Sequence, residues 1–355
     1  MQRVSLLAKW LCSENCSSKQ NQQYAKILRK GFGLSSKQYR QVLSALRKYL
    51  NIVERKMCAN EWDKIDYSAV PSKANLIYKD AFMRHDEARR TEYLDKLQKG
   101  EVKINSSVAF PHDIVHKYGI DLWKPISEVD ITLEEMWKAL PNLVQGCGNT
   151  IVVADGSGSM TVNVDPKART TALEVANSLA IYFAERSRGE FKDKYITFSG
   201  RPQLVDLSQG ETLKDKLNIA RVHNEVAVTN IRATFDLILQ TAIKSNATQD
   251  DIPANVLVIS DMEFNMAVCG RPNETLFQTI EQKFTEAGYK MPRLVFWNVN
   301  SRTNGIPVKE NELGVALVSG FSVNVVKMVM SGKLDPYEVL VEQLMSPRYE
   351  CITLK

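Results

Sequence analysis

Three oxygen-bearing side chains stand two residues apart directly after an apolar run of the sequence. Asp155, Ser157 and Ser159 follow the segment 151–154, and a glycine separates each pair. The glycines let the backbone fold tightly, so one carboxylate and two hydroxyl groups can face the same small volume. Oxygen ligands of this kind suit a hard divalent cation such as Mg²⁺. The spacing therefore predicts a metal-binding loop.

Two later segments supply the same kinds of side chain. A mainly apolar run over 256–260 ends in Asp261, and Thr229 comes just before an amphipathic helix expected over 231–244. Asp261 thus ends a second buried strand, as Asp155 ends the first. A single Asp-x-Ser-x-Ser pattern is a weak signal. Taken together, the three segments supply oxygen ligands for one composite site.

The chain from residue 149 onward alternates strand patterns with helix patterns. The strands are expected at 151–154, 194–198, 203–207, 255–260, 294–299 and 315–318. The helices are expected at 165–188, 213–221, 231–244, 273–287, 322–331 and 335–345, with Asp165 as the first N-cap. This order predicts an α/β, Rossmann-like domain whose doubly wound, mainly parallel sheet carries helices on both faces. Loops at the carboxyl ends of its strands should then bring the candidate residues together.

The same residues allow plainer interpretations. Asp155 could cap the turn that follows it, while Ser157 and Ser159 accept hydrogen bonds from backbone donors. In an intermediate case the fold is as expected and the metal site is weak or empty. Asp261 is followed by Met262 and Glu263, and the Glu263 carboxylate would either add a ligand or obstruct the site.

Enzyme chemistry is not indicated by the residues around this site. The run 156–160 lacks the lysine of a phosphate-binding loop, and a second Asp-Thr/Ser-Gly sequence of an aspartic protease is missing. His223 is the one histidine close to Thr229 in the sequence, which is weak evidence for a general base. His112 and His116 are one helical turn apart and are expected to be packing or surface residues. We therefore expect a protein that is not an enzyme.

The pattern of Asp155, Ser157 and Ser159, with Thr229 and Asp261, resembles the metal-ion-dependent adhesion site of von Willebrand factor A domains. The resemblance implies that the serine and threonine hydroxyls bind Mg²⁺, or another divalent cation such as Mn²⁺ or Ca²⁺. The two aspartates would act directly or through water. Because the hydroxyls are neutral, the cation would stay electrophilic and take a carboxylate from a partner protein. The resemblance thus implies a protein-interaction module that acts as a scaffold or adaptor.

The first part of the chain has a different character. Residues 1–60 hold 12 basic and 2 acidic side chains, and the patterns over 1–145 predict an all-α domain. An amphipathic helix over 36–50, capped by Ser35, carries four basic residues on one side: Lys37, Arg40, Arg47 and Lys48. They are either a solvated face or a stripe that contacts RNA phosphates. We place the domain boundary so that the α/β domain spans 146–355.

The wider sequence resembles a family that joins a helical N-terminal region to a von Willebrand A domain. The resemblance is carried by 70–73, 81–86, 195–199, 229–232 and 318–322. The architecture is similar to that of the Ro ribonucleoprotein family, in which a ring of helical repeats binds small structured RNA. That likeness implies the alternative function, RNA binding through the basic helices with the A domain as a clamp. The helical part is much shorter here than in a complete ring.

Composition limits the class of protein. The 355 residues are enough for two domains with sizeable cores, and no run approaches the roughly 18 apolar residues of a membrane span. The six cysteines are scattered, which favours neither a disulfide framework nor a zinc cluster. The start of the chain is too charged for a convincing signal peptide. We expect a cytoplasmic protein with no membrane association.

Overall fold

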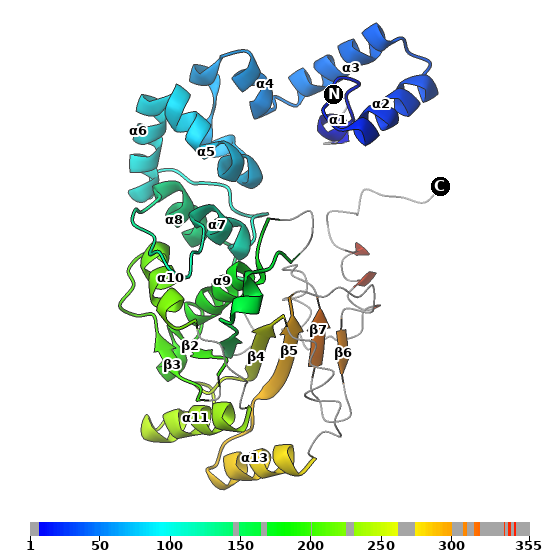
Figure 1. The fold of residues 1–355 in the computed structure, drawn as a ribbon. Helices are drawn as coiled ribbons and strands as arrows, with labels where there is room; N and C mark the ends of the chain where they lie inside the picture. The colour runs from blue at the N-terminus through cyan, green and yellow to red at the C-terminus, as the bar shows by residue number, and fades with distance from the viewer. Residues whose placement is uncertain are drawn as a thin grey trace. The chain divides into compact units, whose positions relative to one another are not determined.

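A computed structural model describes most of the chain and divides it into two compact units, Met1–Asn105 and Ser106–Lys355 (Figure 1). The described residues are 7–144, 149–164, 169–199, 201–224, 231–261, 274–299, 308–310 and 316–319, with single positions at 337, 340, 341, 344 and 345. The expected domain boundary at 145 stays a prediction, and the compact units divide forty residues earlier. The reason is that the helices between residues 106 and 144 belong to the second unit.

The first unit is helical in its described part. Its helices are α1 (Leu7–Trp10), α2 (Lys19–Gly31), α3 (Ser36–Tyr49), α4 (Val53–Cys58), α5 (Ser72–His85) and α6 (Glu87–Gln98), with 3₁₀ turns η1 (Trp62–Lys64) and η2 (Tyr67–Ala69). Helix α3 begins as expected, because Ser35 forms a capping box with Gln38. The N-cap of helix α2 is Ser18, whose side chain accepts from the backbone N–H of Asn21.

A small core joins α2 and α3. Ala25, Tyr39 and Leu43 are buried together, and the Tyr39 hydroxyl donates to the Cys12 carbonyl oxygen at 2.9 Å. The apolar residues of α3 are only partly buried, since Val42 and Tyr49 are exposed. The helix therefore buries a narrower face than the sequence pattern indicates.

A second core fills the space around α5 and α6. Arg90 is fully buried, and its guanidinium lies 4.9 to 5.4 Å from the ring centres of Tyr67, Phe82 and Tyr93. Cation–π contacts of this kind offset part of the cost of burying a charge. Helix α5 begins at Ser72, and Pro71 is its N-cap.

The second unit is built on one sheet. Its strands are β1 (Thr150–Ala154), β2 (Lys194–Thr197), β3 (Leu204–Asp206), β4 (Asn255–Ser260), β5 (Arg293–Asn298), β6 (Val308–Glu310) and β7 (Ala316–Ser319). Their order in the described sheet is β3-β2-β1-β4-β5-β7-β6. All neighbours are parallel except β3 and β6, which pair antiparallel with β2 and β7 at the two edges. The mixed α/β fold with a mostly parallel sheet is as predicted, whereas β6 was not expected.

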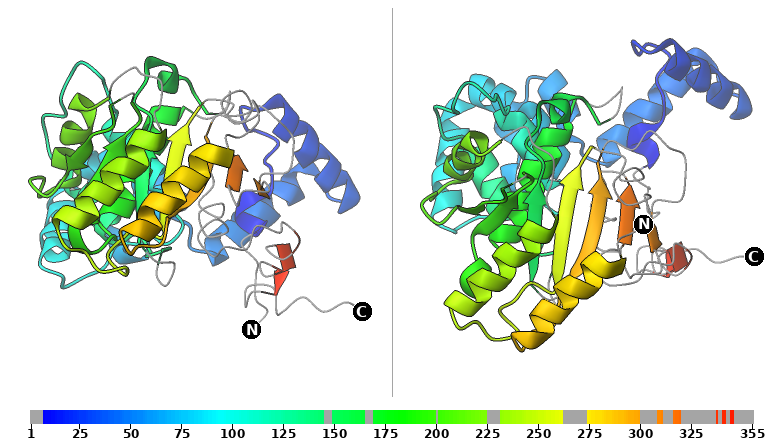
Figure 2. Two further views of the ribbon diagram at one scale, coloured as in Figure 1. Left: turned by 90° about the horizontal axis from the view of Figure 1, so that it is seen from below. Right: turned by 60° about the horizontal axis from the view of Figure 1, so that its bottom comes forward.

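Helices cover both faces of this sheet (Figure 2). The helices and 3₁₀ turns of the unit are α7 (Pro111–Tyr118), α8 (Ile131–Lys138), η3 (Gly158–Thr161), α9 (Ala172–Ala184), η4 (Gly189–Phe191), α10 (Leu213–Val222), α11 (Ile231–Lys244) and α13 (Glu274–Glu286). Side chains of α11 and α13, such as Phe235 and Phe284, pack with Ile151 and Val153 of β1. Because side chains alternate along a strand, Val152 faces the other side, where α9 lies against β1.

Helix α9 is buried along its whole length, because α7 and α10 pack on the side that faces away from the sheet. Its start corrects a prediction. The helix begins at Ala172, capped by a box between Thr171 and Glu174, whereas the expected N-cap, Asp165, lies outside the described residues. A backbone bridge between Asn163 and Thr171 closes the connection that precedes this cap. The helix therefore starts seven residues after the position that the sequence pattern indicates.

Glu134 of α8 ties α10 in place. Its two carboxylate oxygens accept from the backbone N–H of Leu213 at 2.7 Å and of Lys214 at 3.1 Å, and from the hydroxyl of Tyr118. A buried carboxylate at a helix N-terminus is stabilised by the free backbone donors there. No helix in the described part of the chain is long and apolar enough to cross a membrane. The helices expected at 322–331 and 335–345 lie outside the described residues, apart from single positions.

Candidate metal-binding site

Asp155 is the fixed centre of the candidate site. It follows β1 directly and is buried, and its backbone N–H donates to the Ile259 carbonyl oxygen of β4 at 3.0 Å. One carboxylate oxygen accepts from the Ser157 backbone N–H at 2.9 Å, and the other accepts from the Ser260 hydroxyl at 2.6 Å. The carboxylate is thus held on both sides, and its first bond shapes the turn that carries the two serines.

The predicted hydroxyls and the second aspartate meet beside it. The Ser157 and Ser159 hydroxyl oxygens are 2.9 Å apart, and the Ser159 hydroxyl donates to an Asp261 carboxylate oxygen at 3.1 Å. Ser159 and Asp261 are 102 positions apart in the sequence. They are neighbours because β1 and β4 are adjacent parallel strands whose carboxyl ends share one edge of the sheet.

Thr229, the remaining predicted ligand, lies outside the described residues. The described chain that precedes it ends at Asn224, which contacts the Asp155 turn at Gly156. A Cβ atom at Gly156 would lie 2.5 Å from the Cα of Asn224, so only glycine fits this approach. The side-chain nitrogen of Asn224 is buried and has no hydrogen-bond partner in the described part of the chain.

The oxygens of Ser157, Ser159 and Asp261 fit a small hard cation. Mg–O distances of about 2.1 Å place neighbouring ligand oxygens of an octahedron about 3.0 Å apart. The observed separations of 2.9 and 3.1 Å match that edge. A hydrogen-bonded hydroxyl pair has similar spacing, so the match shows only that the site is compatible with the ion. The charges of the two aspartates are a second test of whether a cation fits there.

The charges at the site favour a cation. Burial raises the pKa of Asp261 above its ordinary value, and the negative charge of Asp155 raises it further against the opposing hydrogen bond from Ser159. No ion pair joins either aspartate to a basic side chain within the described residues. Two neighbouring carboxylates without a positive partner are stabilised by a bound cation.

The surroundings offer little for acid–base chemistry. His223 ends α10 as its C-cap, and His116 is 3.0 and 3.1 Å from the two carboxylate oxygens of Glu174, so that histidine holds α7 against α9. His112 is buried in α7. No group of three or more His, Cys, Asp or Glu side chains in the described residues has the arrangement of a metal cluster. The candidate set of Ser157, Ser159 and Asp261 is of a different kind, because two of its three members are serines.

Comparison with known families places the second part of the chain. Residues 149–346 match the model of a family described as a domain of unknown function, DUF7788. The chain belongs to the DUF7788 family. Residues 3–148 match the model of another domain of unknown function, DUF2828, so the DUF7788 region begins just before β1. The candidate metal site therefore lies wholly within the DUF7788 region.

Two individual proteins are similar to this chain. An uncharacterized protein of Acanthamoeba polyphaga mimivirus, L728, is 32% identical over 364 residues, which cover 96% of this chain and 60% of that protein. The chain thus spans about three-fifths of the length of this relative. The crystal structure of the Ro (RSR) protein of Deinococcus radiodurans aligns over 89% of this chain and 68% of that chain, with 14% identity and a TM-score of 0.43.

Two residues of the DUF7788 region contribute to the site without having been expected. Ser260 holds the carboxylate of Asp155, and its position was readable, because it ends the strand that pairs with β1. Asn224 contacts Gly156 from the loop after α10. Nothing in the spacing of the sequence indicates that contact, because it depends on how a loop folds back over the sheet edge.

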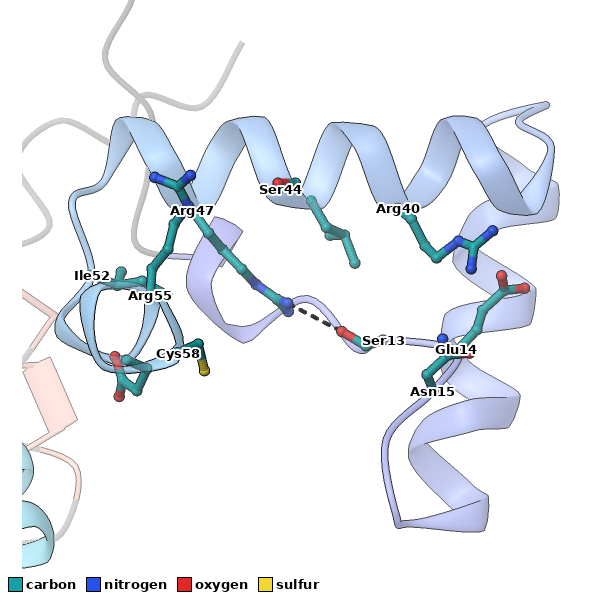
Figure 3. A pocket seen from close by; sticks show the side chains of 11 residues that line it. Ser13, Glu14, Asn15, Arg40, Ser44, Arg47, Ile52, Arg55 and Cys58 are labelled. Carbon is teal, nitrogen blue, oxygen red and sulfur yellow. Dashed lines mark hydrogen bonds between the residues drawn. The ribbon is translucent and has the colours of Figure 1, made fainter. Parts of the chain in front are cut away.

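The four basic residues of α3 do not form one stripe. Lys37, Arg40 and Lys48 are exposed, whereas Arg47 is half-buried and donates to the Ser13 hydroxyl at 3.1 Å and to the Leu11 carbonyl oxygen at 2.8 Å. Arg40 and Arg47 line a cavity (Figure 3), and neither lysine is among the residues that line it. Arg47 therefore has a structural role, and the exposed members of the set differ in their surroundings.

Proposed function

We propose that residues 149–346 form a von Willebrand factor A-like module that binds Mg²⁺, Mn²⁺ or Ca²⁺ and, through the cation, a carboxylate of a partner protein. The observation that carries the proposal is the meeting of Ser157, Ser159 and Asp261 at the sheet edge, with oxygen separations of 2.9 and 3.1 Å. The strand order and the helices on both faces support the comparison with A domains. The free thiols of Cys12, Cys16 and Cys58 suit the cytoplasm as the place of this interaction.

The proposed roles of the residues follow from their contacts. Ser157, Ser159 and Asp261 would hold the cation, and Thr229 would join them from the following loop. Asp155 positions the turn through its bond to the Ser157 backbone, and Ser260 keeps the Asp155 carboxylate oriented. When bound, the cation supplies a positive centre whose charge is only partly neutralised, since serine hydroxyls are neutral ligands. A partner carboxylate is the natural guest of such a centre.

The proposal assigns binding and no reaction. A catalytic site needs a general base or a nucleophile within hydrogen-bond reach of the reacting group. Ser157 bonds to Ser159, and Ser159 donates to Asp261, whereas no histidine of the described residues is bonded to either serine. The module is therefore proposed as a scaffold or adaptor that assembles proteins.

The test is an affinity purification of the full chain in Mg²⁺ and in EDTA. We expect a partner that is captured with Mg²⁺, is released by EDTA and is absent with Ser159→Ala or Asp261→Asn. Glu286→Gln is the matched control, because it removes one exposed carboxylate from α13, away from the candidate residues. Capture of the same proteins in EDTA and by both site variants, with folding unchanged, would show that the proposal is wrong.

A second candidate function is RNA binding by the first unit. It is favoured by the exposure of Lys37, Arg40 and Lys48 on one helix in a segment with a net charge of +10 over residues 1–60, from 12 basic and 2 acidic side chains. Phosphate contacts of this kind predict affinity that falls steeply with salt. Charge reversal at Lys37 and Lys48 should weaken RNA binding and reduce the salt dependence, whereas affinity that does not respond to salt would exclude this function.

A further inference from the structure

A cavity of about 390 Å³ lies within the first unit, independent of the proposed metal site (Figure 3). Three segments form its walls: the turn after α1, one face of α3, and the start and body of α4. Its volume falls in the range of small-molecule sites, about 300–1,000 Å³. Leu43 and Ile52 give it an apolar wall, and Ser13 and Ser44 add small polar groups.

The cavity is positively charged. Arg40, Arg47 and Arg55 line it together with two acids, Glu14 and Glu54. Both acids already have basic partners that are not part of the lining. A Glu14 carboxylate oxygen accepts from the Arg29 Nε at 2.8 Å, and a Glu54 oxygen accepts from the Lys9 Nζ at 3.0 Å. The three arginine charges are therefore left largely unbalanced within the cavity.

The three arginines have different freedom. Arg47 is fixed by its bonds to Ser13 and Leu11, which also hold the turn after α1 against α3. Arg40 and Arg55 are exposed, and no hydrogen bond or ion pair engages their guanidinium groups in the described residues. In Figure 3, Arg55 extends from α4 toward α3, while Arg40 lies at the other end of the cavity, on the side of Glu14. Free guanidinium donors thus stand at both ends, with a fixed one between them.

The helix geometry sets the spacing of this row. Arg40 and Arg47 are seven residues apart on α3, so their Cα atoms are separated by about 10 Å along the axis. That span is too long for one phosphate ion and suits a chain of phosphoryl groups. Arginine forks bind phosphate oxygens in pairs, which makes this anion the best match for the donors present.

We propose that this cavity binds a nucleotide-sized ligand that carries two or more phosphoryl groups. The phosphoryl groups contact Arg40 and Arg55 and lie beside Arg47, and the organic part of the ligand rests on Leu43 and Ile52. Such a group occurs in a free nucleoside diphosphate or triphosphate and at the 5′-triphosphate end of an RNA. The chemistry that the cavity recognises is the same in both sources.

The first measurement is calorimetric titration of the full chain with ADP, pyrophosphate and adenosine, all in EDTA so that the metal site does not contribute. We expect ADP and pyrophosphate to bind and adenosine not to bind. Arg40→Gln and Arg55→Gln should each weaken ADP binding about tenfold, because each removes charge-assisted hydrogen bonds. Lys48→Gln, on the same helix but outside the cavity, should change the affinity less than twofold.

A pair of neighbouring substitutions distinguishes a charge placed in the cavity from the same charge placed elsewhere on the helix. Ser44→Glu places a carboxylate in the cavity, whereas Ala45→Glu places the same charge on the exposed side of α3. We expect the first variant to abolish ADP binding and the second to retain it. Equal loss in both variants, or equal effects of Arg40→Gln and Lys48→Gln, would overturn the proposal.

Cys58 reports the position of the ligand, because its thiol lines the cavity. Saturating ADP should slow the reaction of Cys58 with a maleimide at least fivefold and leave Cys16, which is outside the lining, unchanged. A 5′-triphosphorylated RNA oligonucleotide and its 5′-hydroxyl counterpart distinguish the sources. Protection by ADP supports the proposal, and so does protection by the triphosphorylated oligonucleotide but not by its 5′-hydroxyl counterpart. No protection by any of these ligands at millimolar concentration refutes it, and so does equal protection by both oligonucleotides without protection by ADP.

Discussion

At the sheet edge, Ser159 and Asp261 are brought together from positions 102 residues apart, whereas the cavity of the first unit takes its whole lining from residues 13–58. The first site is made of carboxylates and hydroxyls, which suit a cation. The second contains guanidinium groups, which suit an anion. The site assembled from distant segments is nevertheless the one that the sequence predicts.

The difference lies in what sets the position of each side chain. Backbone pairing aligns Ala154 with Ile259, so the next residues, Asp155 and Ser260, must be neighbours at the strand ends. The hydrogen-bond ladder of a parallel sheet has a fixed register, and the ligands follow from it. In the cavity, the direction of a long arginine side chain is set by its own contacts and not by the backbone register. Arg47, for example, is directed toward Ser13 by a hydrogen bond. Proximity in sequence is thus a poorer guide than register.

Asp155 holds the turn of the sheet-edge site, so Asp155→Ala should lower the stability of the folded chain more than the other substitutions considered. The substitution removes the acceptor of the Ser157 backbone N–H and of the buried Ser260 hydroxyl. Leaving buried donors unpaired should lower the free energy of unfolding by about 2–3 kcal/mol. Urea denaturation in EDTA measures it, with Glu286→Gln as the neutral comparison. A loss below about 0.5 kcal/mol would mean that the carboxylate does not hold the turn.

Arg47 is the residue whose hydrogen bonds hold the cavity in shape, as those of Asp155 hold the sheet-edge site. Arg47→Ala removes two hydrogen bonds, to the Ser13 hydroxyl and the Leu11 carbonyl oxygen, and should cost about 1–2 kcal/mol in the same measurement. Arg55→Ala is the matched control, because Arg55 is exposed and should change stability by less than about 0.5 kcal/mol. Equal effects of the two substitutions would contradict the division into one structural arginine and two free ones.

Tyr39→Phe tests the small core to which Leu43 of the cavity wall belongs, and it should cost about 1 kcal/mol, since it deletes the bond to the Cys12 carbonyl. Burial raises the pKa of Tyr39 above its ordinary value, and the nearby Cys12 adds to the rise. The folded state then keeps the proton at pH values where the unfolded state loses it. Stability from this group is fully present below about pH 10 and is lost as pH rises through the raised pKa.

Thermal unfolding between pH 8 and 11 separates the loss of the Tyr39 hydrogen bond from the effect of its raised pKa. The wild-type chain should lose more stability than Tyr39→Phe over the alkaline part of this range, because the variant lacks the titrating hydroxyl. The difference between the two curves isolates Tyr39 from the other buried tyrosines, which are common to both. Parallel curves would mean that burial does not raise the pKa of Tyr39 in solution.

The sequence predicts the elements that have strong periodicity or register, and it fails where local signals compete. The strand at 255–260 and the helix at 231–244 were expected with the observed bounds. The start of α9 was expected at Asp165, because Asp-Pro resembles a helix start, but Thr171 and Glu174 supply the capping box. Short elements such as β6 carry too few residues for a pattern, and their pairing with a neighbour creates them.

The site residues divide in the same way. Asp155, Ser157, Ser159 and Asp261 were expected at one sheet edge, and the described residues bring them together. Thr229 stays a prediction, because it lies outside the described residues. The contact of Asn224 with Gly156 could not be expected, because a loop that folds over a strand end leaves no periodic signature. The arginine cavity was missed for a similar reason, as the helical pattern of α3 gave one basic side where the structure has two environments.

Ser159→Ala should have the smallest effect on stability, and it tests whether the sheet edge binds a cation. The hydroxyl is exposed, so its loss should change stability in EDTA by less than about 0.5 kcal/mol. Ligand binding stabilises the folded state by about 2.7 kcal/mol when the free ligand is at 100 times Kd. Saturating Mg²⁺ should therefore raise the melting temperature of the wild-type chain and leave that of Ser159→Ala unchanged. An equal Mg²⁺ shift in both proteins would place the cation elsewhere, and the hydroxyl would then serve only to bond Asp261 within the turn.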